Sequence, residues 1–529
     1  MRRFIFALTC VLTTVANANI SADAGNHDNA PSTDISNAIQ PVIKQALTSF
    51  HTPGMAVAVV HENQVVFFEG FGHADVAQQH KVTPNTYFRI ASLSKAFTTA
   101  ALAILVDDNK INWHDKVVDH LPAFTLYNPY VTQEFTILDL LTHKSGLASG
   151  AGDSMIWPQP SGFSVNEIIH NIRYLQPQYG FREQYAYSNV MYITAGEIIA
   201  KVSGESYAEF LQSRIFTPLN MQCFGEDIPS KAIAKTALPY GHTDTQGIFA
   251  ITRNMITQKG VVSAAAGGIV CDLRSMTNWL KSWLSPNTLP FSDAQYAMLT
   301  RPHTLLRPSD NEQKWNNTLF KHYGLGWRIS NIENLKVISH TGTVSGFQSY
   351  MLFFPELDLG VVIMNNGSHS GARSSVMQAI VHHYLSEYKI SPSVIDDWVL
   401  AHETYYEELE QKYLNKLAIP LASAPMTIRD DDIMGRYVDP WFGGINIYQQ
   451  DNILKFAASK MPNLIGTLTP FQDTHYKITW DDSNVAGDAL ITFTLNIDRQ
   501  VTEASLYPFT SRTLTNHSYR DMRFVKDTQ

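Results

Sequence analysis

Cysteine is scarce in this sequence, with three residues in a chain of 529. Cys10 lies in an apolar stretch near the amino terminus, which leaves Cys223 and Cys271 for the folded protein. Two cysteines cannot build the multi-disulfide framework of small secreted domains. They could pair in an oxidising compartment or stay as separate buried thiols, and both alternatives remain open at this point.

Charge is also sparse, at 16% of residues, and it is not basic. Lys and Arg total 39 against 48 Asp and Glu, and the net charge of −9 argues against nucleic acid or an anionic membrane as the main partner. Beyond the short apolar stretch near the amino terminus, no apolar run approaches the ~20 residues of a membrane-spanning helix. No transmembrane segment is therefore expected. A hydrophobic content of 44% indicates a globular protein, and the length predicts two or more domains.

The first residues have the pattern of an export signal. Two arginines follow the initial Met, an apolar run covers residues 4–15, and the tripeptide ending at Ala18 fits the small-residue cleavage pattern. We therefore predict a signal peptide over residues 1–18 and an exported protein, periplasmic or secreted. Residues 19–35 are polar and aperiodic, and predict a flexible leader.

Residues 36–390 predict a first domain of α+β class. Apolar stretches on either side of a polar turn predict two strands in residues 54–71, and strand patterns return at 350–354 and 360–364. Helical spacing fills much of the sequence between them. Strands at both ends with helices between predict an antiparallel sheet made by the two ends and flanked by helices.

A second unit follows the first domain. Residues 391–428 predict a helical linker that ends in a proline-punctuated stretch. Residues 429–529 show strand patterns throughout, with the turn residues Asp451-Asn452 between two of them. We predict a small antiparallel β-barrel-like domain of ~100 residues.

The first chemical signal is the pair Ser92 and Lys95, three residues apart at the start of an amphipathic stretch. A helix there would place both side chains on one face. Serine is a poor nucleophile unless a base takes its proton, and lysine can be that base only if its pKa, ordinarily ~10.4, falls toward neutrality. Alone, the spacing is weak evidence, because a solvated serine and lysine give the same pattern.

Two further motifs follow in order. Tyr187-Ser188-Asn189 precedes a helical stretch, and residues 339–343 read Ser-His-Thr-Gly-Thr after a short apolar strand. The three motifs together resemble the active site of the serine β-lactamase and DD-peptidase family. Tyr-x-Asn resembles the branch with class C β-lactamases, DD-carboxypeptidases, D-aminopeptidases and related esterases. The resemblance extends over residues 40–390 and includes Leu-Leu-Thr-His-Lys-Ser-Gly-Leu at 140–147.

The resemblance implies a role for each site residue and no cofactor or metal. Ser92 would be acylated, while Lys95 and Tyr187 would carry its proton and later activate water. Asn189 would hold the substrate amide. The substrate-binding and oxyanion strand would be formed by His340, Thr341, Gly342 and Thr343, with the backbone N–H groups of Ser92 and Thr343 as the oxyanion hole.

His340 stands where β-lactamases carry lysine, so a permanent cation is missing near neutral pH. This departure favours DD-peptidase, D-amino-acid peptidase or esterase activity on small peptides, peptidoglycan fragments or esters. A class C-like β-lactamase and a slowly turning over penicillin-binding sensor remain alternatives. Substrate identity and oligomeric state are left open.

Other conspicuous residues have simpler interpretations. We expect His143 to fix a loop by hydrogen bonds, because a base is already present. His382 and His383 are adjacent, so on a helix they point to different faces and do not suit a metal. Trp441 and Phe442 could stack on a sugar, but the core of a small β domain is the preferred interpretation.

Overall fold

A computed structural model describes residues 33–390, 395–414, 425–482, 487–509 and 519–527 of the chain. The predicted signal peptide and most of the predicted leader lie outside the described residues. The leader prediction is wrong at its end, because helix α1 (Thr33–Ser49) already begins at residue 33. Within the described residues, no helix has the length and apolar character needed to cross a membrane.

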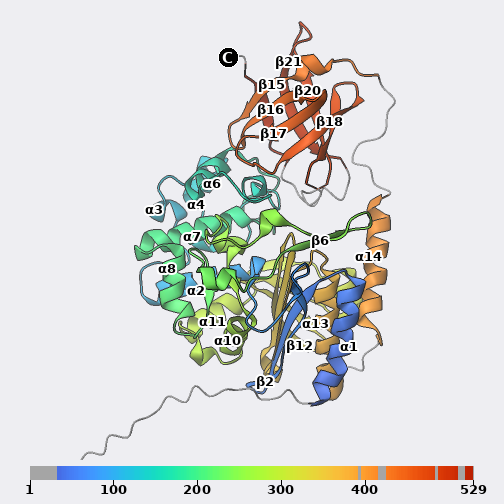
Figure 1. Cartoon of the computed structure of the whole chain (residues 1–529). Coiled ribbons are helices and arrows are strands. Elements are labelled where there is room, and N and C mark those ends of the chain that lie inside the picture. Colours follow the sequence, from blue (N-terminus) through green and yellow to red (C-terminus); the bar gives the residue numbers. More distant parts are fainter. Residues whose placement is uncertain (1–32, 391–394, 415–424, 483–486, 510–518, 528–529) are drawn as a thin grey trace, which may run out of the picture.

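The first domain is built on a central sheet that includes β2 and β12 (Figure 1). This sheet has nine antiparallel strands in the order β3-β2-β1-β14-β13-β12-β11-β10-β9. Strand β1 pairs with β14, so the two ends of the domain meet in the sheet as the sequence predicts. The strand bounds are β1 Gly54–His61, β2 Gln64–Asp75, β3 His80–Lys81, β9 Thr304–Leu306, β10 Lys321–Tyr323, β11 Arg328–Ile332, β12 Leu335–Val344, β13 Phe347–Phe354 and β14 Leu359–Asn365.

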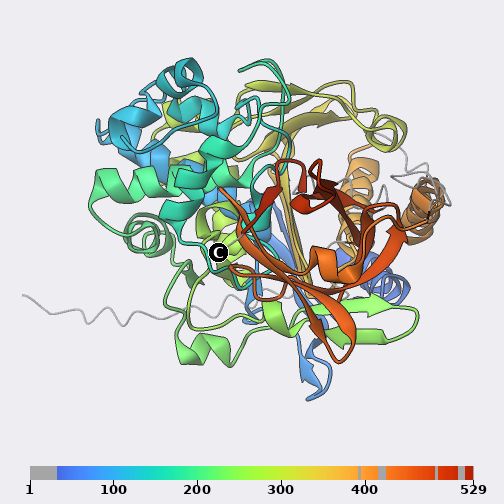
Figure 2. The same cartoon turned by 90° about the horizontal axis from the view of Figure 1, so that it is seen from above.

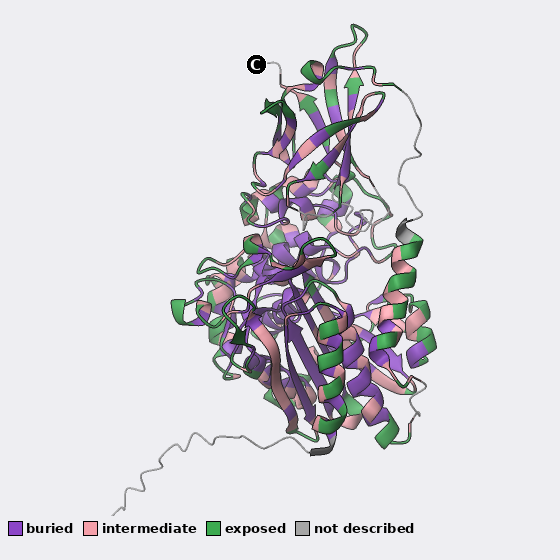
Figure 3. Cartoon of the chain, turned by 45° about the vertical axis from the view of Figure 1, so that its right-hand side comes forward, coloured by how far each residue is buried: buried purple, intermediate pink, exposed green. Residues whose placement is uncertain are grey.

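Alternation along β1 divides the core into two layers. Val57 and Val59 pack with Ile39 of α1 on one face, beneath α13 (Gly371–Glu387) and α14 (Trp398–Leu414). Ala58 faces the helical region on the other side. Strands β1 and β14 at the centre of the sheet are buried along almost their whole length, whereas β2 is mostly half-buried (Figure 3). The linker prediction is therefore wrong for α14, because this helix packs against α13 and α1 as part of the first domain.

The helical region covers the face of the sheet on which Ser92 lies. A small sheet, β4 (Phe88–Arg89), β8 (Val270–Cys271) and β5 (Cys223–Phe224), leads into it, and Cys223 and Cys271 form a disulfide there. Its helices are α2 Ser94–Asp107, α3 Val117–His120, α4 Pro129–Glu134, α5 Ile137–Leu141, α6 Val165–Asn171, α7 Asn189–Ser203, α8 Tyr207–Leu211, α9 Ser230–Ile233, α10 Leu273–Leu284 and α11 Asp293–Thr300, with the hairpin β6 Tyr240–Thr243 and β7 Gly247–Ala250. Helix α12 (Asp310–Asn316) belongs to the other layer, where its Trp315 packs against Trp398 of α14.

The carboxy-terminal domain is a closed antiparallel barrel of strands β15 to β22 that lies against the helical region near α6 (Figures 1 and 2). Asp451 and Asn452 both have positive φ, which matches the two-residue hairpin between β16 and β17. Trp441 and Phe442 are 1% exposed and belong to the core. The strands are β15 Gly435–Asp439, β16 Gly443–Gln450, β17 Ile453–Ala458, β18 Ile465–Gln472, β19 His475–Trp480, β20 Ala489–Leu495, β21 Val501–Pro508 and β22 Arg523–Lys526; a short helix, α15 (Asp430–Ile433), precedes them.

Candidate active site

Ser92 lies on a tight turn between β4 and α2. The 3₁₀ turn Ala91–Leu93 runs directly into α2, and Ala91 has φ of 47°. A non-glycine residue in this left-handed region is strained, and the surrounding structure must hold it in place. The consequence is that the Ser92 side chain is presented, only partly buried, at the entrance of the helix.

Lys95 is fully buried beneath Ser92, in the first turn of α2. Its Nζ donates to Asn189 Oδ1 (2.7 Å) and to the carbonyl of Ala266 (2.7 Å), and lies 3.4 Å from Ser92 Oγ. Burial lowers the pKa of Lys95 well below its ordinary value, with Arg328 adding to the effect and Asp153 opposing it. A neutral amine has two N–H groups, both used here, and one lone pair left for the Ser92 hydroxyl.

Tyr187 contacts Ser92 from the other side. Its hydroxyl donates to Ser92 Oγ at 2.9 Å, and Lys95 Nζ lies 4.7 Å from the centre of its ring. Burial raises the pKa of Tyr187 well above its ordinary value, so the phenol keeps its proton. The sequence-predicted trio of Ser92, Lys95 and Tyr187 therefore meets at one oxygen atom.

Asn189 connects Lys95 to a carboxyl group that the sequence did not indicate. Its Nδ2 donates to both oxygens of Asp153, at 3.2 and 3.0 Å, while its Oδ1 accepts from Lys95. Burial raises the pKa of Asp153 to about 7, although Asn189 and Lys95 both act to lower it. Asn189 is thus oriented by a neighbour on each side.

The second half of strand β12 lies beside the turn that carries Ser92. Strand β11 pairs with β12 only as far as Ser339, so residues 340–344 keep one unpaired edge. A Cβ on Gly342 would collide with the carbonyl oxygen of Ile90, which shows how closely this edge approaches the turn carrying Ser92. Arg373 of α13 fixes the strand by donating to the carbonyl of Gly342. Thr343 lies beside this contact, is exposed, and donates its hydroxyl to Gln348 Oε1.

His340 is neutral and fully satisfied. Its Nδ1 lies 2.7 Å from the carbonyl of Thr341 and its Nε2 lies 3.1 Å from the hydroxyl of Tyr323, an arrangement that suits a proton on Nδ1. Burial lowers the pKa of His340 well below its ordinary value, and Arg328 and Lys95 add to the effect. His340 therefore supplies no positive charge to the site.

The cation that contacts Thr341 of this strand is Arg328 instead. It begins β11, is only partly exposed, and its Nη1 donates to Thr341 Oγ1 at 3.3 Å. In the part of the chain that the structure describes, tyrosines surround it and no carboxylate forms a salt bridge with it. Sequence reasoning missed Arg328, although it directly follows the Tyr-Gly-Leu-Gly-Trp stretch at residues 323–327.

His143 fixes a loop, as the sequence predicts. Its Nδ1 accepts from the backbone N–H of Ser188 (3.0 Å) and its carbonyl accepts from Ala186 (2.9 Å), so it holds the loop that carries Tyr187. Its pKa is lowered well below the ordinary value, first by burial. His382 stacks on Trp398 and lies 3.1 Å from Asn316 Oδ1.

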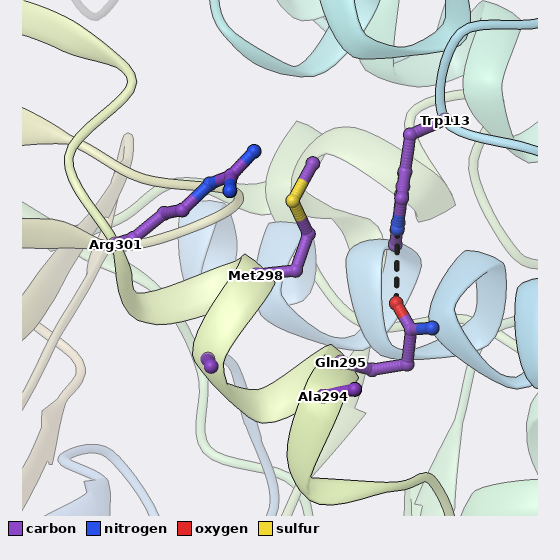
Figure 4. A pocket seen from close by; sticks show the side chains of 6 residues that line it. Trp113, Ala294, Gln295, Met298 and Arg301 are labelled. Atoms are coloured by element: carbon purple, nitrogen blue, oxygen red, sulfur yellow. Dashed lines mark hydrogen bonds between the residues drawn. The ribbon is translucent and has the colours of Figure 1, made fainter.

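The described residues include a pocket of a different character, apart from the site around Ser92. Among these residues, no three His, Cys, Asp or Glu side chains are grouped so that they could hold a metal ion. The separate pocket on α11, between Trp113 and Arg301, contains no nucleophilic side chain; its main polar contact is Trp113 Nε1 to Gln295 Oε1 at 2.9 Å (Figure 4).

The fold and the site define a serine hydrolase of the β-lactamase type. Residues 39–384 match the Beta-lactamase family, and the chain belongs to this family. Residues 431–526 match a family described only as a domain of unknown function, DUF3471.

Two curated relatives are distant. Unguisins hydrolase ungD' of Aspergillus campestris is 26% identical over 439 residues, 79% of each chain. Protein flp of Staphylococcus aureus is 26% identical over 330 residues, 62% of each chain.

Two solved structures share the fold. An octameric penicillin-binding protein homologue from Pyrococcus abyssi has a TM-score of 0.60 at 19% identity, covering 93% of this chain and 100% of that one. A class C β-lactamase from Rhodobacter sphaeroides has a TM-score of 0.54 at 22% identity, covering 66% of this chain and 100% of that one.

Proposed function

We propose that Ser92 is the nucleophile of an acyl-enzyme mechanism. Neutral Lys95 takes the proton of Ser92 as Oγ bonds to the substrate carbonyl carbon, and the bond to the leaving group breaks. Tyr187 relays a proton to that leaving group, with Lys95 returning it. Water then attacks the acyl ester and gives a proton to the same pair. The pair returns that proton to Ser92 Oγ as the acyl bond breaks, which releases a carboxylic acid and free Ser92.

The proposed substrates are small peptides with a free carboxylate beyond the scissile bond, as in DD-carboxypeptidase reactions. The observation that carries this proposal is Arg328 beside Thr341. This guanidinium lies at the strand that lines the site and has no salt bridge to a carboxylate among the described residues. A guanidinium binds carboxylates through paired hydrogen bonds. The neutral state of His340 argues against efficient penicillin destruction, because that residue supplies no charge.

Three substrates that share the same acyl group test this proposal. They are a D-Ala-D-Ala peptide, the same peptide with a carboxy-terminal amide, and a p-nitrophenyl ester. We expect the free acid to exceed the amide by about 10- to 100-fold in kcat/KM, the range of a charge-assisted hydrogen-bond pair. Arg328→Gln should abolish that preference and leave the ester rate close to wild type. Equal rates on acid and amide in the wild type would contradict recognition of the carboxylate, and hydrolysis of the ester without either peptide would indicate an esterase.

We also propose that the protein is exported. The basic and apolar start of the sequence supports this, as does the Cys223–Cys271 disulfide, since disulfides persist in oxidising compartments. Fractionation of expressing cells followed by amino-terminal sequencing tests the proposal. The expected result is a periplasmic or secreted protein that begins at Asn19, and an intact cytoplasmic chain would contradict it.

A further inference from the structure

One loop of the barrel grips one segment of the hydrolase domain. We call residues 459–464, between β17 and β18, the barrel loop, and residues 153–163 the gripped segment. Asn463 Nδ2 donates to the carbonyl of Gln159 (2.6 Å), and the backbone N–H of Gly162 donates to the carbonyl of Lys460 (2.8 Å). A Cβ on Gly162 would lie 2.8 Å from that carbonyl oxygen, so the approach requires glycine.

The Lys460 side chain makes further contacts with the hydrolase domain, one of them beyond the gripped segment. Its Nζ forms an ion pair with Glu167 at the start of α6 and lies 4.9 Å from the ring centre of Phe163. The pKa of Glu167 is lowered to about 2, mainly by the hydrogen bond from Lys460. The barrel loop therefore holds the segment through main chain, side chain and charge.

The buried side chain of Gln159 faces the catalytic residues. Its Oε1 accepts from Arg89, a buried guanidinium that has no salt bridge to a carboxylate in the described residues. Its Nε2 lies 3.4 Å from Ser263 Oγ. Arg89 precedes Ser92 by three residues, and Ser263 begins the turn that contains Ala266, the carbonyl partner of Lys95.

The other end of the gripped segment also reaches the site. Asp153 contacts Asn189, which contacts Lys95. A single segment thus touches the strand before Ser92, the turn beneath Lys95, and the amide beside Lys95. Errors of about 1 Å in catalytic geometry can cost ~100-fold in rate, so support at these three points has a direct bearing on catalysis.

We propose that the barrel loop helps to hold the catalytic residues in place. Asn463 and Gln159 are positioning residues that keep Ser92 and Lys95 in the geometry needed for acylation. The proposal rests on the proposed role of Ser92. The carboxy-terminal domain then acts through defined hydrogen bonds to the segment beside the nucleophile and does not itself contact the substrate.

The test compares two barrel-side variants of the full-length protein. Asn463→Asp keeps the shape of the side chain but removes the donor to Gln159. Arg520→Ala is the matched control, because Arg520 also joins the barrel to the hydrolase domain, at Gln178 and the carbonyl of Pro177, away from the gripped segment. Acylation rates and KM are measured with a p-nitrophenyl ester, and folding is followed by thermal unfolding.

We expect Asn463→Asp to slow acylation about 10-fold with KM within about two-fold of wild type, since misplacement acts on the transition state. Arg520→Ala should match wild type. Gln159→Glu provides a second test if Asn463→Asp does not fold. It keeps the acceptor for Arg89 but loses the donor to Ser263, and a fall of about three-fold is expected.

Equal acylation rates in Asn463→Asp and Arg520→Ala would overturn the proposal, as would a change confined to KM. For Gln159→Glu, a wild-type acylation rate would do the same. Failure of the proposed function is distinguished by a measurement on the wild type alone. In that case the wild-type protein would form no acyl adduct on Ser92.

Discussion

The central sheet and the carboxy-terminal barrel are both antiparallel, but they use their strand edges differently. The barrel closes on itself, so each of its strands has a partner on both sides. In the sheet, β11 stops pairing with β12 at Ser339, and residues 340–344 keep one edge unpaired beside the turn that carries Ser92. Unpaired backbone groups are what an extended substrate or an oxyanion can use.

The interior around Ser92 and the interior of the barrel also differ in polarity. Around Ser92 the protein buries charged and titratable groups that form no salt bridge within the described residues, among them Lys95 and Arg89. The barrel fills its interior with large apolar side chains such as Phe456 and Phe493. Burying polar groups costs stability, and burying apolar ones provides it. The comparison indicates that the groups suited to catalysis lie at the sheet, while the barrel contributes to the stability of the protein and supports the site.

Removal of the proposed nucleophile is the largest expected effect. Ser92→Ala should reduce ester hydrolysis by about 10⁴-fold or more, as for other triad-type nucleophiles, and should leave thermal stability near wild type. Intact-mass spectrometry after incubation with a fluorescent penicillin checks the assignment directly. We expect an adduct on wild type and none on the variant; an adduct that persists in Ser92→Ala would mean that another residue is the nucleophile.

Lys95→Arg should have the next largest effect. The side chain stays long and basic, but guanidinium cannot give up its proton, so no lone pair is left for the Ser92 hydroxyl. We expect kcat to fall by about 10³-fold, within the range for loss of a general base. Burst kinetics with a p-nitrophenyl ester measure this, and retention of a tenth of the wild-type rate would remove Lys95 as the base.

The sequence predicted the parts of the site that lie in local motifs. Ser92 and Lys95 are three residues apart, and Tyr187 and Asn189 two apart, so helix and turn geometry brings each pair together. It also predicted the sheet made by the two ends of the domain. Arg328, Asp153 and the contact between Gln159 and Arg89 join residues far apart in the chain. No spacing rule links such residues, and only the tertiary fold of the first domain brings them together.

Phe456→Ala tests the barrel side of the comparison. Phe456 is fully buried and packs edge-on against Trp480. Its truncation should lower the free energy of unfolding by about 3–5 kcal/mol, the usual cost of an aromatic-to-alanine cavity. Well below the unfolding transition, hydrolysis should stay near wild type. Calorimetry paired with ester kinetics measures both quantities, and a large loss of rate in fully folded protein would contradict the division of roles.

Asp153→Asn tests a buried group on the sheet side through the pH dependence of stability. The pKa of Asp153 is about 7 in the folded protein against 3.8 ordinarily, because burial disfavours the anion. The folded state therefore holds a proton between about pH 4 and 7 that the unfolded chain releases. The free energy of unfolding of the wild type should fall across this window and level off above it, by a few kcal/mol at ~1.4 kcal/mol per pKa unit.

The asparagine introduced by Asp153→Asn does not titrate, but its side-chain oxygen can still accept from Asn189. Denaturant unfolding at several pH values should thus show the variant gaining on wild type from about pH 4 to 7. Asp108→Asn is a control of opposite sign, since a hydrogen bond from Arg214 lowers the pKa of Asp108. Wild type should gain on that variant as pH rises through the acid range, by a small amount because the pair is on the surface. A stability difference for Asp153→Asn that does not change with pH would mean that Asp153 ionises like an exposed carboxyl, and that Asn189 is oriented by an anion.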